Sequence, residues 1–402
     1  MIFYVFKFIL NFLLNICSFI MKFIIRKDNN IILIGGWMGE TFSDNSRFLY
    51  QYLHHYSDKK VVWVTRNNEI LKELSEKGYH VYKMHSMKSY YYHFKAGIHI
   101  VCNVPFKTKE HKGDILGELS LYSRRIQLWH GNPLKGIGSI SDSNTHVEDV
   151  NFSRRISNCL KASRIYRHLI NVGGGWDDCT FLATSNLAGN VFSKAFGIDN
   201  KNICITAYPR NCECLEYLSN ELKVLEQIEG KRTILYVPTF REKNNVIMHP
   251  LTDKAFEKFI SDNNFLWIEK RHLVDSKKRE SNINSIVDEL VLPSTFDLNV
   301  LVPKVDILIT DYSSICFDFI FFNKPVQYYV PDFEFYEEEE RGFSLGFEDY
   351  TAGWVSKSIS DLADNIRFQS ISIPVNKIQN VKSEIYKEED AKYSDIVKKL
   401  EL

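Results

Sequence analysis

The chain has 402 residues, of which 45% are hydrophobic and 25% are charged, a length sufficient for two domains that each have a core. Lys and Arg together number 50, as do Asp and Glu, so the formal net charge at pH 7 is zero. This balance argues against a protein that binds nucleic acid through bulk charge, and any recognition of phosphate must therefore be local.

Residues 1–25 are strongly apolar and precede Arg26 and Lys27. No small-residue cleavage site follows, which argues against a signal peptide. The segment is long enough to span a bilayer, because about 20 apolar residues suffice. A helix that lies in the membrane surface, or one that packs on the protein's own core, would also fit this length.

The polar residues of this segment favour the in-plane helix. At roughly 100° per residue they fall on one narrow stripe, opposite an apolar face. Such a helix lies in the membrane interface with its lysines toward the headgroups. We therefore expect residues 1–27 to form an amphipathic membrane helix, while the spanning and packed alternatives stay open. The stripe consists of Lys7, Asn11, Asn15, Ser18 and Lys22, and the apolar face includes Phe3, Phe6, Leu10, Leu13, Leu14 and Phe23.

Beyond residue 31 the pattern is strand, loop and helix, repeated. Strands alternating with helices imply a parallel, doubly wound sheet. Because the series restarts near residue 181, we expect an α/β protein with two Rossmann-like domains that face each other across a cleft. The domains are predicted at 28–185 and 186–354, and a charged helical segment at 355–402 would close over the back of the pair. The strand-like runs lie at 31–36, 61–65, 80–84, 97–104 and 125–131, then at 181–185, 202–208, 233–240, 265–272, 290–293, 306–314 and 325–332, with helical patterns at 45–56 and 68–78.

The first candidate motif is LWHGNPLKGIG, residues 128–138, where a predicted strand ends just before His130. Ligands of open α/β sheets collect at the carboxyl ends of the strands. A histidine placed there is suited to proton transfer at neutral pH. A lone turn histidine is more often structural, but the Gly, Pro and Lys that follow His130 favour a functional role.

Three further motifs place cationic or hydroxyl side chains just beyond predicted strands. An arginine at a strand end can bind phosphate oxygens with its forked guanidinium. Taken singly, each of these arginines fits an ordinary surface residue equally well. The motifs are AYPRNCE with Arg210, YVPTFRE with Thr239 and Arg241, and IEKRH with Lys270 and His272.

The strongest motif is ITDYSSICFDF, residues 309–319. A strand ends at Asp311, and Ser313 and Ser314 open a helix. Hydroxyls and unpaired backbone N–H groups at a helix N-terminus bind anions. A plain serine cap is the structural alternative, and it is compatible with anion binding. We therefore predict a pyrophosphate site here.

Metal-binding patterns are weak. The cysteines contain no CxxC pair, and the close spacing of Cys212 and Cys214 has no second half. Zinc sites and disulfide frameworks need paired spacings, so free thiols in a reducing compartment are expected. An acidic run at 337–340 fits a solvated helix face better than a metal site. No metal held by the protein is predicted.

Together the motifs HGNPLK, YPRN, VPTFR, KxH, TDYSS with FD four residues on, and NKP followed by RGF resemble the CDP-glycerol glycerophosphotransferases of teichoic-acid and capsule synthesis. The similarity runs from about residue 40, in FSDNSRFLYQYL, to about residue 353. It implies a glycosyltransferase-B type fold and peripheral attachment to the cytoplasmic face of the cell membrane. It also implies CDP-glycerol or CDP-ribitol as the donor, which a divalent cation could accompany.

The resemblance implies a role for each candidate residue. His130 and His272 match the catalytic histidines, although Leu273 replaces a proline after the second. The donor side would include Arg210, Thr239, Arg241, Lys270, Asp311, Ser313 and Ser314, and the acceptor side Asn132 and Lys135. Two further positions depart from the family pattern, because Asn132 replaces a threonine and Cys212 an acid.

The expected reaction moves a glycerol-phosphate or related polyol-phosphate unit to a lipid-linked saccharide or polymer and releases CMP. His130 would accept the proton of the attacking hydroxyl. His272, Arg210, Arg241 and the serine pair would stabilise the phosphoryl charge, and exchanged roles for the two histidines stay open. The alternatives are a sugar-nucleotide glycosyltransferase of the same fold and a non-catalytic scaffold of a polymer-export complex. The presence of both histidines argues against the scaffold.

Overall fold

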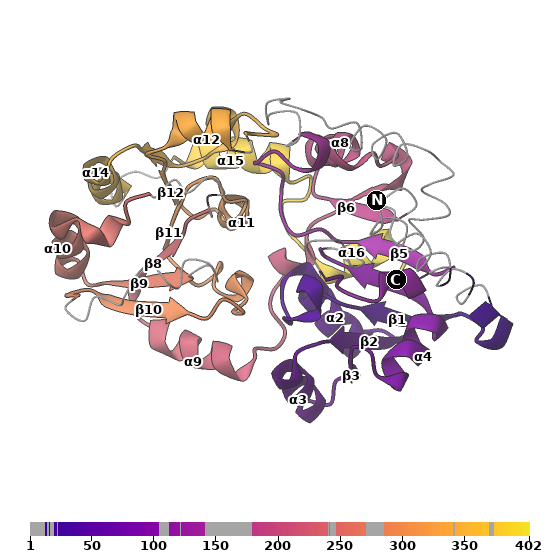
Figure 1. Cartoon of the computed structure of the whole chain (residues 1–402). Coiled ribbons are helices and arrows are strands. Elements are labelled where there is room, and N and C mark those ends of the chain that lie inside the picture. Colours follow the sequence, from indigo (N-terminus) through magenta and orange to yellow (C-terminus); the bar gives the residue numbers. More distant parts are fainter. Residues whose placement is uncertain are drawn as a thin grey trace.

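The computed structural model describes residues 23–103, 112–120, 122–140, 179–239, 241, 247–270, 285–340, 342–369 and 374–402, with residues 13, 16, 20 and 21. In this part of the chain two parallel sheets lie side by side, and helices cover both (Figure 1). Alternating strands and helices predict this arrangement, because a helix that crosses between parallel strands covers a face of the sheet. The predicted two-sheet α/β fold is confirmed.

The first sheet has the strand order β3-β2-β1-β4-β5-β6-β7, and every neighbouring pair is parallel. Its central strands are apolar and buried, as strands covered on both faces must be. The strands are β1 (Asp28–Ile34), β2 (Lys60–Thr65), β3 (Val81–Lys83), β4 (Ala96–Val101), β5 (Arg124–Gln127), β6 (Thr180–Ala183) and β7 (Ile203–Ile205). The helices beside them are α2 (Asp44–Tyr56), α3 (Asn68–Glu76), α4 (Met87–Lys95) and α8 (Asn186–Phe196).

The second sheet has the order β10-β9-β8-β11-β12-β13, also parallel throughout. Its strands are β8 (Arg232–Val237), β9 (Phe265–Lys270), β10 (Asp288–Leu292), β11 (Ile307–Thr310), β12 (Val326–Tyr329) and β13 (Trp354–Ser356). Its helices are α9 (Ser219–Ile228), α10 (Lys254–Asp262), α11 (Ile315–Phe321), α12 (Phe333–Glu339), α13 (Phe347–Tyr350) and α14 (Ile359–Gln369).

The chain passes between the sheets later than the sequence predicts. The predicted boundary near residue 185 falls between β6 and α8, yet β7 pairs with β6 and completes the first sheet. The passage therefore lies in residues 206–231. The run that forms β7 looks like the start of a new series because α8 separates it from β6, and β7 itself is only half-buried.

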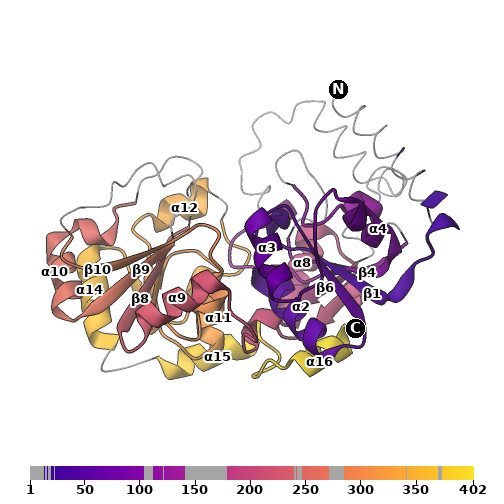
Figure 2. The same ribbon diagram turned by 90° about the horizontal axis from the view of Figure 1, so that it is seen from below.

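The C-terminal helices lead from the second sheet back to the first. After α14, which packs on β12 and β13, α15 (Val375–Ile385) packs against α11 and α8. The following α16 (Tyr393–Lys399) lies at the edge of the first sheet, where Lys399 Nζ donates to the carbonyl of Ile205 at 3.1 Å. In Figure 2, α15 lies along the lower edge of the second domain and α16 along that of the first.

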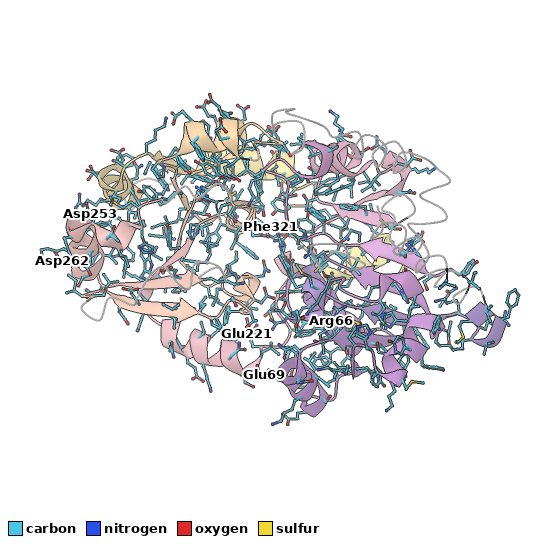
Figure 3. All side chains as sticks on the ribbon, viewed as in Figure 1. Arg66, Glu69, Glu221, Asp253, Asp262 and Phe321 are labelled. Carbon is cyan, nitrogen blue, oxygen red and sulfur yellow. The ribbon has the colours of Figure 1, made fainter. Side chains whose placement is uncertain are left out.

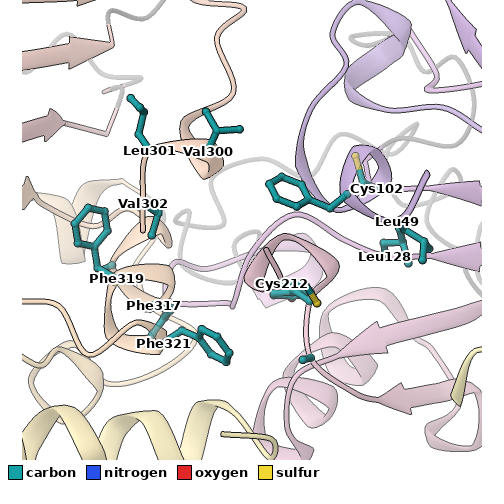
Figure 4. Packing of buried hydrophobic residues seen from close by; sticks show 14 of the residues in the cluster. Leu49, Cys102, Leu128, Cys212, Val300, Leu301, Val302, Phe317, Phe319 and Phe321 are labelled. Carbon is teal, nitrogen blue, oxygen red and sulfur yellow. The ribbon is translucent and has the colours of Figure 1, made fainter. Parts of the chain in front are cut away.

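One hydrophobic cluster contains residues of both sheets. It includes Leu49 and Leu128 from the first domain and Phe317, Phe319 and Phe321 of α11 from the second. In Figure 4 the phenylalanines of α11 lie across from the first-domain residues, with Cys212 between them. Burying one such side chain contributes about 1.5–3 kcal/mol, so this shared cluster fixes how the two sheets sit against each other.

No helix among the described residues is long and apolar enough to cross a membrane. Most of the predicted membrane helix, residues 1–27, lies outside the described residues. Where the described chain begins, Phe23 and Ile24 are 73% and 69% exposed. Lys27 is held at α4, because its Nζ donates to the carbonyl of His93 at 3.1 Å, and burial lowers its pKa to about 8.

Candidate active site

The candidate residues gather where the two sheets meet. The turn after β5 carries His130, the 3-10 turn Pro209–Asn211 carries Arg210, and α2 begins with Asp44. The first residues of α11 approach the same place from the second domain, since a Cβ on Gly131 would lie 2.6 Å from Ser314 Oγ and 3.2 Å from Ser314 Cβ. This close approach leaves little room for a side chain at position 131, and it places Ser314 beside the His130 turn.

His130 is held in the tautomer that a general base needs. Its Nδ1 lies 3.0 Å from the carbonyl oxygen of Cys102. A carbonyl oxygen can only accept, so Nδ1 carries the hydrogen and donates it. In the neutral ring this leaves the lone pair on Nε2, the atom able to take a proton from an attacking hydroxyl.

The surroundings of His130 keep it neutral. Its ring lies against the indoles of Trp129, with centroids 4.1 Å apart, and Trp37, 5.5 Å apart. Burial lowers the pKa of His130 below its usual value, and the charges of Arg210 and Lys135 lower it further. The Asp44 carboxylate and the Cys102 carbonyl oppose that shift. The net lowering favours the unprotonated ring at neutral pH.

Arg210 is bound by carboxylates of the protein. Its Nε and Nη2 donate to Asp318 at 2.9 Å each, in a bidentate pair. Its Nη1 donates to Asp44 Oδ1 and to the carbonyl of His130, both at 2.8 Å. Arg210 is 5% exposed and thus joins α2, the His130 turn and α11. In this structure it positions other groups, and its predicted contact with the donor phosphate stays a prediction.

Asp44 and Asn45 belong to the site, although no sequence motif identified them as candidate residues. Asp44 also accepts the indole N–H of Trp37 at 3.1 Å. The Asn45 side chain donates to the carbonyl of Trp129 at 2.9 Å and accepts the backbone N–H of Arg210 at 3.2 Å. Both residues lie in the stretch FSDN. Because Asp and Asn at a helix start usually serve as caps, the sequence alone does not indicate a role in the site.

Arg47, one turn further along α2, forms a second buried cluster. Its Nη2 donates to Glu221 Oε2 at 2.7 Å and to the carbonyl of Glu216 at 3.0 Å, while Nη1 lies 3.5 Å from Asp297 Oδ2. Glu221 lies on the part of α9 that faces the first domain (Figure 3). The guanidinium side chain is fully buried, so this cluster ties α2 to two elements of the second half of the chain.

Three predicted donor-side residues brace the ends of β8 and β11. The Thr239 N–H donates to the Asp311 carboxylate at 2.9 and 3.0 Å. Arg241 pairs with Asp311 at 2.9 Å and with Asp332 at 2.8 Å. Its guanidinium also lies over the rings of Tyr312 and Tyr336, at 4.9 and 5.0 Å. The structure thus brings Thr239, Arg241 and Asp311 together, with the arginine turned toward protein carboxylates.

The other predicted residues have different surroundings. Lys270 Nζ donates to the carbonyl of Phe296 at 2.7 Å. Asn132 is buried and its Oδ1 accepts the Thr184 hydroxyl at 2.6 Å, which makes it part of the turn's support. The backbone of Lys135 pairs with that of Phe343, and its carbonyl accepts the Ser344 hydroxyl at 2.8 Å. Residues 342–344 of the second domain therefore pack against the segment that follows His130.

His272 falls in residues 271–284, which lie outside the described residues, so its catalytic role stays a prediction. Among the residues that are described, no group of three or more His, Cys, Asp or Glu side chains could hold a metal ion. The described cysteines are free thiols.

The family model described as CDP-Glycerol:Poly(glycerophosphate) glycerophosphotransferase matches residues 17–400. The teichoic acid poly(glycerol phosphate) polymerase of Bacillus spizizenii is 26% identical over 375 residues, 88% of each chain. The teichoic acid glycerol-phosphate transferase of Staphylococcus aureus is 24% identical over 358 residues, 85% of this chain and 84% of its own. The solved structure of the wall teichoic acid polymerase TagF shares the fold, with a TM-score of 0.69 at 19% identity over 93% of this chain and 89% of that one. The chain belongs to the CDP-glycerol:poly(glycerophosphate) glycerophosphotransferase family.

Proposed function

We propose that this enzyme transfers a glycerol-phosphate unit from CDP-glycerol, or a related polyol-phosphate from its CDP donor, to a teichoic-acid-type acceptor and releases CMP. The family membership and the activities named for its relatives support this reaction. The observation that carries it is the state of His130, whose Nδ1 is bound to the Cys102 carbonyl at 3.0 Å and whose Nε2 keeps the lone pair.

In the proposed reaction a hydroxyl of the acceptor attacks the β-phosphorus of the donor. A new P–O bond forms, the bond to the CMP oxygen breaks, and CMP leaves with the electron pair. His130 Nε2 takes the proton of the attacking hydroxyl. The phosphoryl charge needs donors fixed in place, because such transfers are accelerated mainly by positioning and electrostatics.

The hydroxyls of Ser313 and Ser314 are the donor-phosphate groups that we favour. Ser314 lies against the His130 turn, and its hydroxyl does not cap α11. The helix that follows is only 7 residues long, so we assign the binding to the hydroxyls and not to the helix dipole. His272, Arg210, Arg241 and Lys270 stay in the proposal as groups that a bound donor would engage.

We also infer that the enzyme acts at the cytoplasmic face of the cell membrane on a lipid-linked acceptor. The polar stripe of residues 1–27 supports an amphipathic anchor, and the two parallel sheets support a glycosyltransferase-B arrangement with a cleft between them. The proposal places no protein-held metal at the donor site and allows a divalent cation to accompany the donor.

The test is an assay of the purified full-length protein with a lipid-linked disaccharide and either CDP-glycerol or CDP-ribitol. We expect CMP release and a product heavier by one or more polyol-phosphate units. Release of a nucleoside diphosphate from a sugar nucleotide, with the sugar on the acceptor, would indicate the glycosyltransferase instead. A folded protein that turns over none of these donors would favour the scaffold.

A further inference from the structure

We propose that Asp44 is a positioning residue for the transfer reaction, because its carboxylate holds both the main chain and the ring surroundings of His130. The inference rests on the proposed function, in which His130 is the base. Among the described residues, the Asp44 carboxylate bonds to neighbours of His130 and makes no hydrogen bond to the imidazole itself. It acts through Arg210 and Trp37, which take one of its oxygens each.

The first path runs through Arg210. Asp44 Oδ1 accepts from Arg210 Nη1 at 2.8 Å, and the same nitrogen donates to the His130 carbonyl at 2.8 Å. The Asp44 oxygen and the His130 carbonyl therefore share one nitrogen of the guanidinium. If that nitrogen moved away, the His130 carbonyl would lose this hydrogen bond. The main chain at His130, which sets the direction of the imidazole, would then be less restrained.

The second path runs through Trp37. Asp44 Oδ2 accepts the indole N–H at 3.1 Å, and the ring centroid of Trp37 lies 5.5 Å from that of His130 at an interplanar angle of 53°. Trp37 has a φ of 41°, in the left-handed region that a bulky side chain rarely adopts. Such a backbone persists only where the surroundings hold it, and the Asp44 contact is one such restraint.

Some of the described non-glycine residues with a positive φ lie around His130, and Trp37 is one of them. Trp129, directly before His130, has a φ of 57°, and Asp44 itself has a φ of 61°. Strain of this kind gathers at sites whose geometry the fold over-determines. The left-handed Trp37 and Trp129 on either side of the imidazole support a geometry that the surroundings hold in place, and Asp44 bonds to Trp37.

The charge of Asp44 adds an electrostatic consequence. The charged groups that act on His130 are Asp44 from α2, Arg210 from the 3-10 turn after β7, and Lys135 from the loop after β5. Asp44 raises the pKa of His130, whereas the two cations and burial lower it. Removing the Asp44 charge should lower the pKa of His130, so the base stays unprotonated to a lower pH.

A purely structural brace is the competing role, and Asp297 provides the matched control. Its carboxylate accepts the backbone N–H of Asp44 at 3.0 Å and lies beside Arg47, yet it makes neither of the two contacts that lead to His130. Asp297→Asn therefore weakens the same helix start without touching the proposed paths. Asp58→Asn, an exposed change just past the other end of α2, is the neutral control.

The experiment measures kcat and KM for CDP-glycerol across pH, and thermal unfolding, for the wild type and the Asp44→Asn, Asp44→Glu, Asp297→Asn and Asp58→Asn variants. We expect Asp44→Asn to lower kcat by about 10²-fold, the scale of a 1 Å misplacement, with KM little changed. The acidic limb of its kcat–pH profile should move to lower pH. Asp44→Glu keeps the negative charge but places the carboxylate one methylene farther from the backbone. It should therefore leave the acidic limb of the pH profile in place and lower kcat. Asp297→Asn should lower stability and leave the limb in place.

An NMR titration of His130, assigned by comparison with His130→Ala, separates this inference from the proposed function. A lower His130 pKa in Asp44→Asn supports the inference even if CDP-glycerol proves to be the wrong donor. An unchanged His130 pKa, or an Asp44→Asn variant that behaves like Asp297→Asn in every measurement, would overturn it. A wild type that releases no CMP would overturn the proposed function alone.

Discussion

At the scale of the residue, the position of His130 depends on main-chain contacts as much as on its ring. Its carbonyl is bound by Arg210, the carbonyl before it by Asn45, and its Nδ1 by the Cys102 carbonyl. Each partner comes from a different element, so the imidazole is fixed from several sides. Such support is what lets a base reach a reacting hydroxyl in one orientation.

Replacing the imidazole should therefore remove the chemistry and leave the fold. His130→Ala should lower turnover by roughly 10²- to 10⁴-fold, the usual contribution of a positioned acid–base group. The residue as a whole is only half-buried, so thermal unfolding should change little. CMP release from CDP-glycerol measures the effect, with His55→Ala, an exposed histidine near the end of α2, as the control. Near-wild-type CMP release would remove His130 from the mechanism.

The sequence predicted which residues matter better than it predicted their partners. His130 and Ser314 follow strands β5 and β11, and the rule that ligands collect at strand ends brought both into the candidate site. The carboxylates that bind Arg210 come from residues 44 and 318, one before it and one after it in the chain. No local pattern reveals such a pairing. The expectation that Arg210 faces phosphate followed from its position alone.

At the scale of the element, α11 and its two serines show what a short helix contributes. Its 7 residues are almost all buried, so the helix mainly packs the interface, while Ser313 and Ser314 stay partly exposed at its start. The sequence motif identified this helix correctly. The motif did not predict the length of the helix, which depends on where the buried phenylalanines end. That short length also limits what the helix dipole can contribute.

Removing both hydroxyls tests the donor site. Ser313→Ala combined with Ser314→Ala should weaken CDP binding by about 10- to 100-fold, because a hydrogen bond to a charged group contributes about 1.5–3 kcal/mol. Calorimetry with CDP measures the change, and Ser383→Ala, whose hydroxyl bonds only to its own helix at 2.8 Å, is the matched control. Unchanged affinity would leave the serines with a packing role.

The start of α2 is held by the buried charge cluster around Arg47. Arg47→Met should cost about 3–5 kcal/mol, because Glu221 and Asp297 would keep buried charges without their cation. The combined change Arg47→Met with Glu221→Leu should recover part of that loss. Thermal unfolding measures both, and Lys72→Met, in an exposed pair with Glu76 at 3.9 Å, should have a small effect. Equal losses for the single and combined changes would contradict this account.

At the scale of the whole molecule, the two sheets meet through a shared apolar cluster and two buried ion clusters, one of which, around Arg210, contacts the His130 turn. The sequence predicted two α/β units from their repeated pattern. It placed the boundary too early because the pattern of β7 looks the same on either sheet, and only pairing with β6 decides its place. Which strand lies at the edge of a sheet depends on the strands that pair with it, and the local sequence does not reveal this pairing.

The proposed membrane anchor, residues 1–27, can be tested by deletion. Near the start of the continuously described chain, Lys27 is bound to the carbonyl of His93 in α4 at 3.1 Å. Deleting residues 1–22 keeps this contact and removes the predicted amphipathic stripe. An interfacial helix gains from buried apolar area and about 1 kcal/mol for each basic residue near anionic headgroups. The shortened enzyme should keep its activity on a water-soluble acceptor and lose most of its activity on a lipid-embedded one, since anchoring raises the local concentration of that acceptor.

Two measurements separate an in-plane helix from a spanning one. Vesicle binding of the full-length protein should weaken in Lys7→Gln combined with Lys22→Gln, by roughly 2 kcal/mol at low salt, if these lysines face the headgroups. High salt or alkaline carbonate should release an in-plane protein from membranes, at least in part. A spanning helix would resist both treatments, because its hydrocarbon contacts do not depend on ionic strength, and a tag at Met1 would then be reachable from the outer face. Release by detergent alone together with an accessible tag would therefore reject the in-plane anchor while leaving the site around His130 unaffected.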